Sequence, residues 1–446
     1  MIAVSSLSRR ISICALAFAM NSPCRAQVAT DHSSQENATH VVEAWPDPLI
    51  THTGKAIQSA SEFNAIRRSE LLHDFEENVF GRTPTQHLPE SMDVDSVDDH
   101  AFSGTAIRKQ ITITVGSTAF HRKLHLLMYL PAHRTGAVPV FVGLNFNGNQ
   151  SVTTDPGVEL TDVWMPDPEV SSVPLAKELE GHFHGKPAET SRGADASQWP
   201  VAEILEAGYG VATLYAGDIE PDFASGIAYG IRPLFFNKGQ SLPAADDWGA
   251  IGAWAWGMSR AVDYLVSDPA IDAHAIIAIG HSRFGKTALW AAAQDPRFAI
   301  VISNESGQGG ASLSHREAAE SIAHLNIAFP YWFCANYHRF TGRTEELPVD
   351  GHLLLALIAP RPLFVASAHD DPFSDPEGEF LSAKAASSVY RLFGKNGLPA
   401  DANYEVNKPE GKTLRYFVRP GGHDIQLSDW QRYIQFVDEN RPGRSD

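Results

Sequence analysis

The chain has 446 residues, of which 43% are hydrophobic, 10% aromatic and 20% charged, so it has enough apolar residues for a substantial core. This composition excludes extended disorder, collagen and coiled coil. With 35 basic and 53 acidic residues the formal net charge is −18, which repels a phosphate backbone or an anionic membrane. Nucleic acid is therefore not expected as a partner.

The first residues have the pattern of a secretory signal peptide. Arg9 and Arg10 precede an apolar run over residues 11–20, and Ala26 stands where a signal peptidase requires a small residue. The run is about half as long as a membrane-spanning helix, and no later segment is long and uncharged enough to replace it. We predict cleavage after residue 26, no membrane span, and a secreted or periplasmic protein.

Two of the three cysteines, Cys14 and Cys24, lie in the predicted signal peptide, so the remaining Cys334 has no partner for an internal disulfide. Cys334 ends the aromatic stretch 329–334. A thiol in such a setting is typical of a buried structural residue rather than of a nucleophile.

The N-terminal half predicts a flexible lead-in over residues 27–44, followed by a single domain over residues 45–446. Apolar spacing and alternation then predict, in chain order, a helix at 61–80, strands at 110–115 and 123–130 that form a hairpin, and buried strands at 138–146 and 208–215. A polar insertion around residues 150–200 separates the last two strands.

The C-terminal half alternates regularly between the two kinds of element. The predicted order is helix 250–266, strand 275–280, helix 286–294, strand 299–303, strand 362–367, helix 383–393, strand 414–419 and helix 429–439. Strands that lack a polar face and alternate with helices form mostly parallel sheets covered on both sides. The sequence therefore predicts an α/β fold with a mostly parallel sheet sandwiched between helices, in three layers.

The strongest chemical signal is a serine on a sharp turn between the strand 275–280 and the following helix. Gly280 and Gly285 have no side chains, which allows the strand and the helix to approach closely. The helix N-terminus near Ser282 favours the negative charge that develops on the substrate oxygen. This is the pattern of a nucleophile elbow. It departs from the common G-x-S-x-G form, because Phe284 stands where the second glycine is usual. The alternative interpretation is a loop with an incidental serine.

A nucleophilic serine needs a base, and His423 is the predicted one. It lies in a glycine-rich loop just after the strand 414–419, where a loop can bring an imidazole to the serine hydroxyl. The chain contains 19 histidines, but only His423 combines such a loop, a strand end and a position C-terminal to Ser282. The order serine, acid, histidine is that of the α/β-hydrolases.

Two carboxylates are candidates for the acid of the triad. Glu305 follows the strand 299–303, and Asp371 follows the strand 362–367, so both are expected at the catalytic edge of the sheet. Asp370 is a near neighbour that the sequence does not exclude, and either loop is alternatively a solvated turn. We expect Glu305 and Asp371 to share the role, with a small preference for Glu305 because its glycine-rich loop allows close backbone approach.

The motif Gly280-His-Ser-Arg-Phe-Gly-Lys286 resembles the G-x-S-R-x-G-K elbow of the glucuronoyl esterases, carbohydrate esterase family fifteen. Further blocks resemble that family in the same order, at residues 304–310, 329–334, 359–368, 375–380 and 421–423. The resemblance implies an α/β-hydrolase that cleaves the ester between glucuronic acid on xylan and an alcohol, typically of lignin, with no metal and no cofactor. A monomer is expected.

The resemblance also implies roles for side chains around the serine. Arg283 would place a fixed cation beside the oxyanion, which suits its planar donor geometry. Lys286 would reach sugar hydroxyls, although a solvated cation at a helix start is the alternative. Glu320 matches a sugar-contacting carboxylate, with a surface helix as its alternative, and Trp332 is expected to bind substrate. Phe373 stands where bacterial relatives often carry Trp; a phenyl ring stacks on a sugar but lacks the indole N–H.

Two rival functions remain open on the sequence. One is an acetyl (xylan) esterase or another serine carboxylesterase, which would use the same triad without contacts to the uronate. The other is a carbohydrate-binding relative with an inactive triad, which the presence of serine, acid and histidine disfavours.

Two other clusters of residues give only weak evidence for a metal site. His182 and His184 alternate like a metal pair but have no third ligand at a suitable spacing, so a solvated loop is predicted. The acidic run 93–99 lacks the central glycine of a calcium loop and is expected to be solvated.

Overall fold

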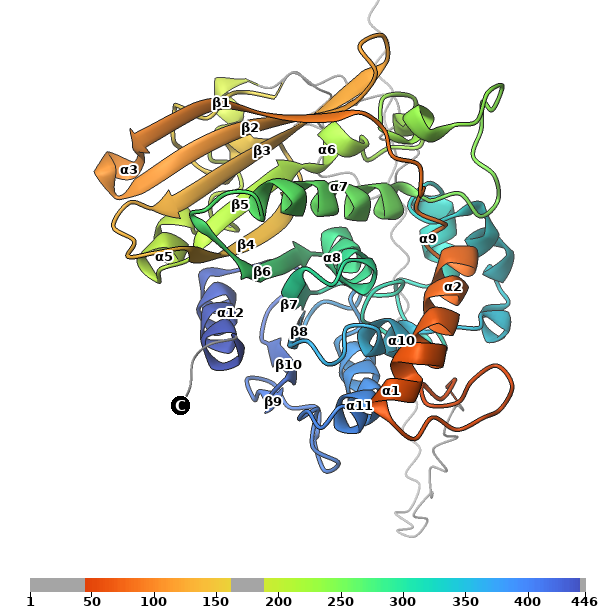
Figure 1. Ribbon diagram of the computed structural model, residues 1–446. Helices are drawn as coiled ribbons and strands as arrows, with labels where there is room; N and C mark the ends of the chain where they lie inside the picture. Colours follow the sequence, from red (N-terminus) through yellow and green to blue (C-terminus); the bar gives the residue numbers. More distant parts are fainter. Residues whose placement is uncertain (1–44, 162–187, 442–446) are drawn as a thin grey trace, which may run out of the picture. The chain divides into compact units, whose positions relative to one another are not determined.

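A computed structural model describes residues 45–161 and 188–441 of the chain (Figure 1). The predicted signal peptide, the lead-in and the pair His182 and His184 lie outside the described residues, and those predictions are not tested by the structure. Within the described ranges, no helix combines the length and the apolar character needed to cross a membrane.

The described residues form one ten-stranded sheet in the order β1-β2-β3-β5-β4-β6-β7-β8-β10-β9. The strands are β1 (Glu90–His100), β2 (Ala106–Gly116), β3 (His121–Pro131), β4 (Val138–Asn145), β5 (Gly210–Tyr215), β6 (Ile271–His281), β7 (Phe298–Asn304), β8 (Leu363–Ala368), β9 (Glu410–Gly411) and β10 (Leu414–Arg419). Neighbours from β5 to β10 pair in parallel, as the alternation of strands and helices predicts. Parallel strands end at one edge, so the loops after β6, β7, β8 and β10 meet there.

The other side of the sheet is antiparallel, since β1, β2, β3 and β5 pair in that way. The predicted hairpin at 110–130 is the β2–β3 pair. The acidic run 93–99 is indeed exposed, but it belongs to the edge strand β1, which the sequence analysis missed. Charged side chains on an exposed edge oppose pairing with a second sheet.

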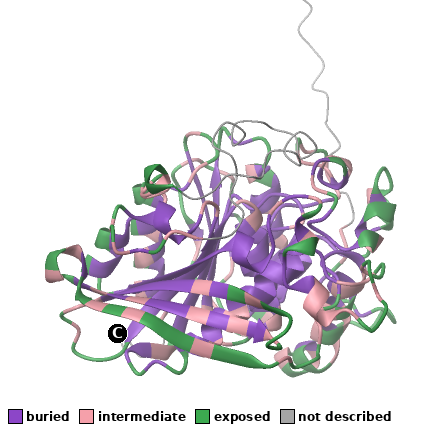
Figure 2. Ribbon diagram, turned by 90° about the horizontal axis from the view of Figure 1, so that it is seen from above, coloured by how far each residue is buried: buried purple, intermediate pink, exposed green. Residues whose placement is uncertain are grey.

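Helices cover both faces of the sheet and make three layers (Figures 1 and 2). Alternate residues of the central strands belong to different clusters: Ile276 and Ala278 pack with the first group of helices, Ile277 and Ile279 with the second. The first group is α2 (Arg68–Asn78), α7 (Ala250–Leu265), α8 (Arg283–Gln294), α10 (Gly351–Ala356) and α11 (Pro376–Leu392). The second is α5 (Val201–Glu206) and α12 (Leu427–Asn440).

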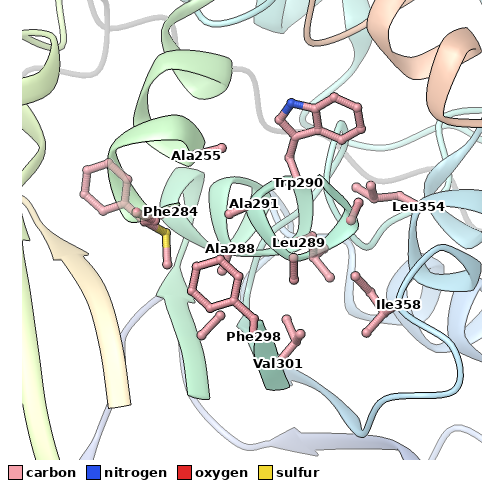
Figure 3. Close-up of a cluster of buried hydrophobic side chains, with 14 of the residues drawn as sticks. Ala255, Phe284, Ala288, Leu289, Trp290, Ala291, Phe298, Val301, Leu354 and Ile358 are labelled. Carbon is pink, nitrogen blue, oxygen red and sulfur yellow. The ribbon is translucent and has the colours of Figure 1, made fainter. Parts of the chain in front are cut away.

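The helix that follows the serine is held by a dense apolar core (Figure 3). Phe284, Ala288 and Trp290 are at most 1% exposed, and the ring of Trp290 stacks on Phe80 at 4.6 Å. Burial of one such large side chain contributes about 1.5–3 kcal/mol. Cys334 is also buried, and burial raises the pKa of its thiol to about 11. The prediction of a buried cysteine is confirmed.

Most helix and strand positions are predicted correctly, but α11 begins at Pro376 rather than at residue 383. The signals for this start are in the sequence: Asp375 caps the helix by accepting a hydrogen bond from the Gly378 amide, and proline occupies the first helical position. Apolar spacing alone favours the later start at residue 383. The early start places Glu379 under the loops of the site.

Candidate active site

Ser282 lies at the tip of the turn between β6 and α8. Its φ of 58° and ψ of −130° lie in a region that costs a non-glycine residue about 1–3 kcal/mol. A Cβ on Gly280 would come within 1.9 Å of the Phe284 carbonyl oxygen, and one on Gly285 within 2.9 Å of the Ser306 Cβ. Gly285 is thus needed even though it is one residue later than in the common motif. The geometry is that of the predicted nucleophile elbow.

His423 lies in the loop after β10 and faces both predicted acids. Its Nδ1 is 2.7 Å from Oδ2 of Asp371 and 3.1 Å from Oε2 of Glu305. The two acids come from the ends of the neighbouring strands β7 and β8, as the sequence predicts. Asp370 instead accepts a hydrogen bond from the Gly421 amide.

The two carboxylates have different surroundings. Burial raises the pKa of Glu305, which also accepts hydrogen bonds from Arg419 Nη2 at 2.8 Å and from the Asp424 amide at 2.9 Å. Burial of Asp371 acts in the same direction, but the hydrogen bond with His423, the charge of His423 and the hydrogen bonds with Ser374 together outweigh it and lower the pKa of Asp371. Asp371 also has the shorter contact to the imidazole, whereas the Glu305 carboxylate is shared between His423 and Arg419.

The acids also set the charge of the imidazole. Burial lowers the pKa of His423, but the hydrogen bonds and charges of Asp371 and Glu305 outweigh burial and raise it to about 9. The ring is therefore protonated at neutral pH in the absence of substrate. As a base it works in the fraction that has lost this proton, and the acids then stabilise the imidazolium it forms.

A second histidine, which the sequence analysis treated only as a spacer in the motif, packs against the first. The rings of His281 and His423 lie 4.5 Å apart, and Nδ1 of His281 is 2.6 Å from Oδ1 of Asn304. Burial, and then the charge of His423, lower the pKa of His281 to about 3. His281 is therefore neutral when His423 is charged.

Within residues 45–161 and 188–441, one group of three side chains brings possible ligand atoms within 4.8 Å of one another: His281, Glu305 and His423. One nitrogen of each imidazole is already engaged: Nδ1 of His423 faces two carboxylates, and Nδ1 of His281 faces the Asn304 side chain. Metal binding requires a neutral imidazole with a free lone pair. These residues fit a shared proton better than a metal ion.

Arg419 holds Glu305 and the loop of His423 in place by hydrogen bonds. It donates to Glu305, to Asp429 Oδ2 at 3.0 Å, and to the carbonyl oxygens of Gly422 and Asp424 on either side of His423. The side chain is 5% exposed. One buried guanidinium therefore fixes the histidine loop to the end of β7 and to α12.

Glu379 lies under the same turn. Its carboxylate accepts hydrogen bonds from the amides of Ser306 at 2.8 Å and Gly307 at 3.0 Å, and from the Ser367 hydroxyl at 2.5 Å. Burial raises the pKa of Glu379 to about 8. It thus joins the loop after β7, which carries Glu305, to the end of β8, and nothing in the sequence indicated this role.

Arg283, directly after the nucleophile, is held by a carboxylate that the sequence analysis missed. Its Nη1 donates to Oδ2 of Asp222 at 2.5 Å, and the guanidinium lies 5.2 Å from the ring centre of Phe146 and 5.0 Å from that of Trp332. Asp222 lies beyond β5, after the short helix α6 (Ala216–Ile219). No local pattern in the sequence marks it as part of the site.

Lys286 and Glu320 form a buried pair next to Trp332. Nζ of Lys286 lies 2.8 Å from Oε2 of Glu320 and donates to the Ser306 carbonyl oxygen at 2.6 Å. Lys286 is 2% exposed, so the alternative of a solvated cation is wrong. Glu320 precedes the helix α9 (Ile322–Ala328) and contacts Lys286, so the alternative of a surface helix is also wrong. Trp332 stacks on Phe329 at 3.8 Å.

Phe373 differs from these residues because its ring is largely exposed. It is 51% exposed and lies 5.8 Å from the ring of His324, while its backbone amide donates to Asp371. An exposed aromatic ring beside the acid loop is available for stacking on a sugar. Whether Phe373, Trp332, Lys286 and Glu320 contact substrate stays a prediction.

The parallel sheet, the strained serine between β6 and α8, and the order serine, acid, histidine define a serine hydrolase of the α/β-hydrolase class. Comparison with known proteins gives the family. A family model for fungal glucuronyl esterases matches residues 241–394. The carbohydrate esterase MZ0003, from an unknown prokaryotic organism, is 42% identical over 398 residues, which are 89% of this chain and 90% of that protein.

Solved structures agree with this assignment. A glucuronoyl esterase from Solibacter usitatus is 44% identical and matches with a TM-score of 0.83 over 89% of this chain and 97% of its own. A promiscuous esterase of carbohydrate esterase family 15 from a marine bacterial metagenome is 41% identical, with a TM-score of 0.80 over 89% and 97% of the two chains. The chain belongs to the glucuronoyl esterases of carbohydrate esterase family 15. The expected family and fold are thereby confirmed.

Proposed function

We propose that the protein hydrolyses the ester between glucuronic or 4-O-methyl-glucuronic acid of xylan and an alcohol of lignin. The observation that carries the proposal is the imidazole of His423, which lies between two carboxylates and packs at 4.5 Å against His281, the residue before Ser282 in the elbow. Such an arrangement activates a hydroxyl for attack on an ester carbonyl. The chain also belongs to the glucuronoyl esterases.

The reaction proceeds in two acyl transfers. The Ser282 oxygen attacks the ester carbonyl while His423 takes the hydroxyl proton, and the imidazolium then gives this proton to the leaving alcohol. A water molecule, deprotonated by the same imidazole, attacks the acyl-enzyme and releases the uronic acid and the serine. Arg283 donates to the oxyanion that forms in each step.

The buried pair of Lys286 and Glu320 suits recognition of the sugar. A positive and a negative group side by side offer both donors and acceptors to hydroxyl groups, and Trp332 adds an aromatic wall within 5.9 Å of the Lys286 ammonium. We propose that these residues and Phe373 bind the glucuronate ring. No cofactor or metal takes part in the proposed steps.

Hydrolysis of benzyl glucuronate, compared with benzyl galacturonate and p-nitrophenyl acetate, tests the proposal. A glucuronoyl esterase should prefer the glucuronate, and Ser282→Ala should lower kcat by about three orders of magnitude or more while the protein stays folded. Retention of more than about a tenth of the activity by Ser282→Ala would contradict the nucleophile. A preference for the acetate would support the alternative function of an acetyl esterase. This alternative is worth testing because a relative from the marine metagenome is described as promiscuous.

We further propose that the protein acts outside the cytoplasm as a monomer. The sequence before residue 27 supports export, and a polymeric substrate has to be met outside the cell. The N-terminal sequence of the exported protein should begin at Gln27, and light scattering should give the mass of one chain. An uncleaved N-terminus or a dimer mass would overturn these two points.

A further inference from the structure

The carboxylate of Asp222 accepts hydrogen bonds from three donors, one on Arg283 and two on the adjacent residues Tyr331 and Trp332. Oδ2 accepts the hydrogen bond from Arg283 Nη1, and Oδ1 accepts two, from the Tyr331 hydroxyl at 2.8 Å and from the Trp332 Nε1 at 2.8 Å. The aspartate side chain is 21% exposed. Both oxygens are therefore held, so the position of the acceptor for Arg283 is fixed from two sides.

The arginine keeps donors to spare. A guanidinium has five N–H groups, and in the described part of the chain Arg283 uses only Nη1 in a hydrogen bond. Its Nε is buried without a hydrogen-bond partner among the described residues. Nη2 also makes no hydrogen bond to the described residues, and the Arg283 side chain is 28% exposed, so this nitrogen is the donor available to an oxyanion. Asp222 thus anchors one end of the fork while other N–H groups stay available.

The rigidity of this anchor matters for the reaction. A free arginine side chain carries about 2 kcal/mol of rotamer entropy, which would be lost each time it met an oxyanion. Donors that are already in place cost no such ordering at the moment of reaction. Asp222, with the rings of Phe146 and Trp332, holds Arg283 before substrate arrives.

We propose that Asp222 is a positioning residue for acyl transfer and acts through Arg283. The inference rests on the proposed function for the identity of the ester, but it concerns how the transition state is stabilised. It predicts that Asp222 affects kcat rather than KM, and that its effect exists only when Arg283 is present.

A double-mutant cycle tests this dependence. Asp222→Asn keeps an oxygen for Tyr331 and Trp332 but can present an amide N–H, a donor, to Arg283. On benzyl glucuronate we expect kcat to fall about 10- to 100-fold with KM within about threefold. In an Arg283→Ala background the same substitution should change kcat by less than about threefold, because the residue it acts through is gone.

A matched control is Asp263→Asn. Asp263 also accepts a hydrogen bond from an arginine, Arg297 Nη1 at 2.6 Å, and its side chain is 25% exposed, but it lies on α7 away from the serine. It should leave kcat unchanged. Tyr331→Phe removes one restraint on the Asp222 carboxylate and gives a second test if Asp222→Asn does not fold. We expect a severalfold loss in kcat that also vanishes without Arg283.

The outcomes separate the inference from the proposed function. Equal losses in both backgrounds, an unchanged kcat, or a loss confined to KM would each overturn the role of Asp222. If the unmodified enzyme fails on benzyl glucuronate, the proposed substrate is wrong, and the rate of fluorophosphonate labelling of Ser282 then replaces kcat in the same cycle. Labelling that Asp222→Asn slows only when Arg283 is present would still support the inference.

Discussion

Replacing Glu305 by Gln and Asp371 by Asn, singly and together, tests how two acids serve one histidine. With an effective dielectric constant of about 20, contacts of 3.1 Å and 2.7 Å to an imidazolium are worth about 5 and about 6 kcal/mol, before solvent screens them. The difference is about 1 kcal/mol, less than a factor of ten in rate. Either acid can therefore cover much of the loss of the other.

The expected losses follow from this near equality. The His423 side chain is 42% exposed, so screening reduces both attractions, and each single variant should lose about 10- to 10³-fold in kcat/KM. Removal of a lone triad acid costs about 10⁴-fold, and the double variant should lose at least about as much. We expect the larger single loss for Asp371→Asn, because Glu305 is also neutralised by Arg419. The sequence alone favoured Glu305.

The assay is kcat/KM on benzyl glucuronate for the three variants and the unmodified enzyme. Asp370→Asn is the matched control: it lies next to Asp371 in the same loop but accepts a hydrogen bond from Gly421, so it should stay close to the unmodified rate. A double variant no worse than one of the single variants would refute the reasoning. It would show that one carboxylate serves the histidine, and the single variant would identify it.

Three further predictions concern the cation, the base and the buried acid. Arg283→Lys should lower kcat about 10²-fold on benzyl glucuronate, because an ammonium lacks the fork geometry; an effect on KM alone would make Arg283 a substrate binder. Because the pKa of His423 is about 9 and the base is the neutral form, kcat/KM should rise with pH up to about 9. Asp371→Asn should move this rise to lower pH, and an unmoved profile would contradict the contact between Asp371 and His423. Glu379 has a pKa of about 8 instead of 4.5, so between these values the folded state binds more protons than the unfolded state, and the free energy of unfolding should fall as pH rises. Denaturant titrations at several pH values should show a smaller fall for Glu379→Gln, and an unchanged pH dependence would contradict the raised pKa.

The sequence predicted what depends on local pattern. The central strands are apolar throughout, and Ser282, Glu305, Asp371 and His423 each follow one of them, so their meeting at one edge could be expected. The strand β1 was missed because it is exposed along most of its length and shows no apolar alternation.

Contacts between distant segments could not be predicted. Asp222 is 61 residues from Arg283 and 109 from Tyr331, and nothing local distinguishes its carboxylate from a solvated one. Glu379 is likewise 73 residues from the amide of Ser306 that it binds. Such pairs depend on how loops cross above the sheet, which periodicity does not encode. The family resemblance supplied Lys286 and Glu320 but gave no sign that they form a buried pair.

The hydrogen bonds of Arg419 also couple the catalytic base to the helix α12. This guanidinium binds the carbonyl oxygens around His423 and, at the same time, Asp429 of α12. Loss of one partner from a buried ion pair costs about 3–5 kcal/mol. The position of the base therefore depends on how α12 packs against the sheet, so a substitution that loosens this helix should also displace His423.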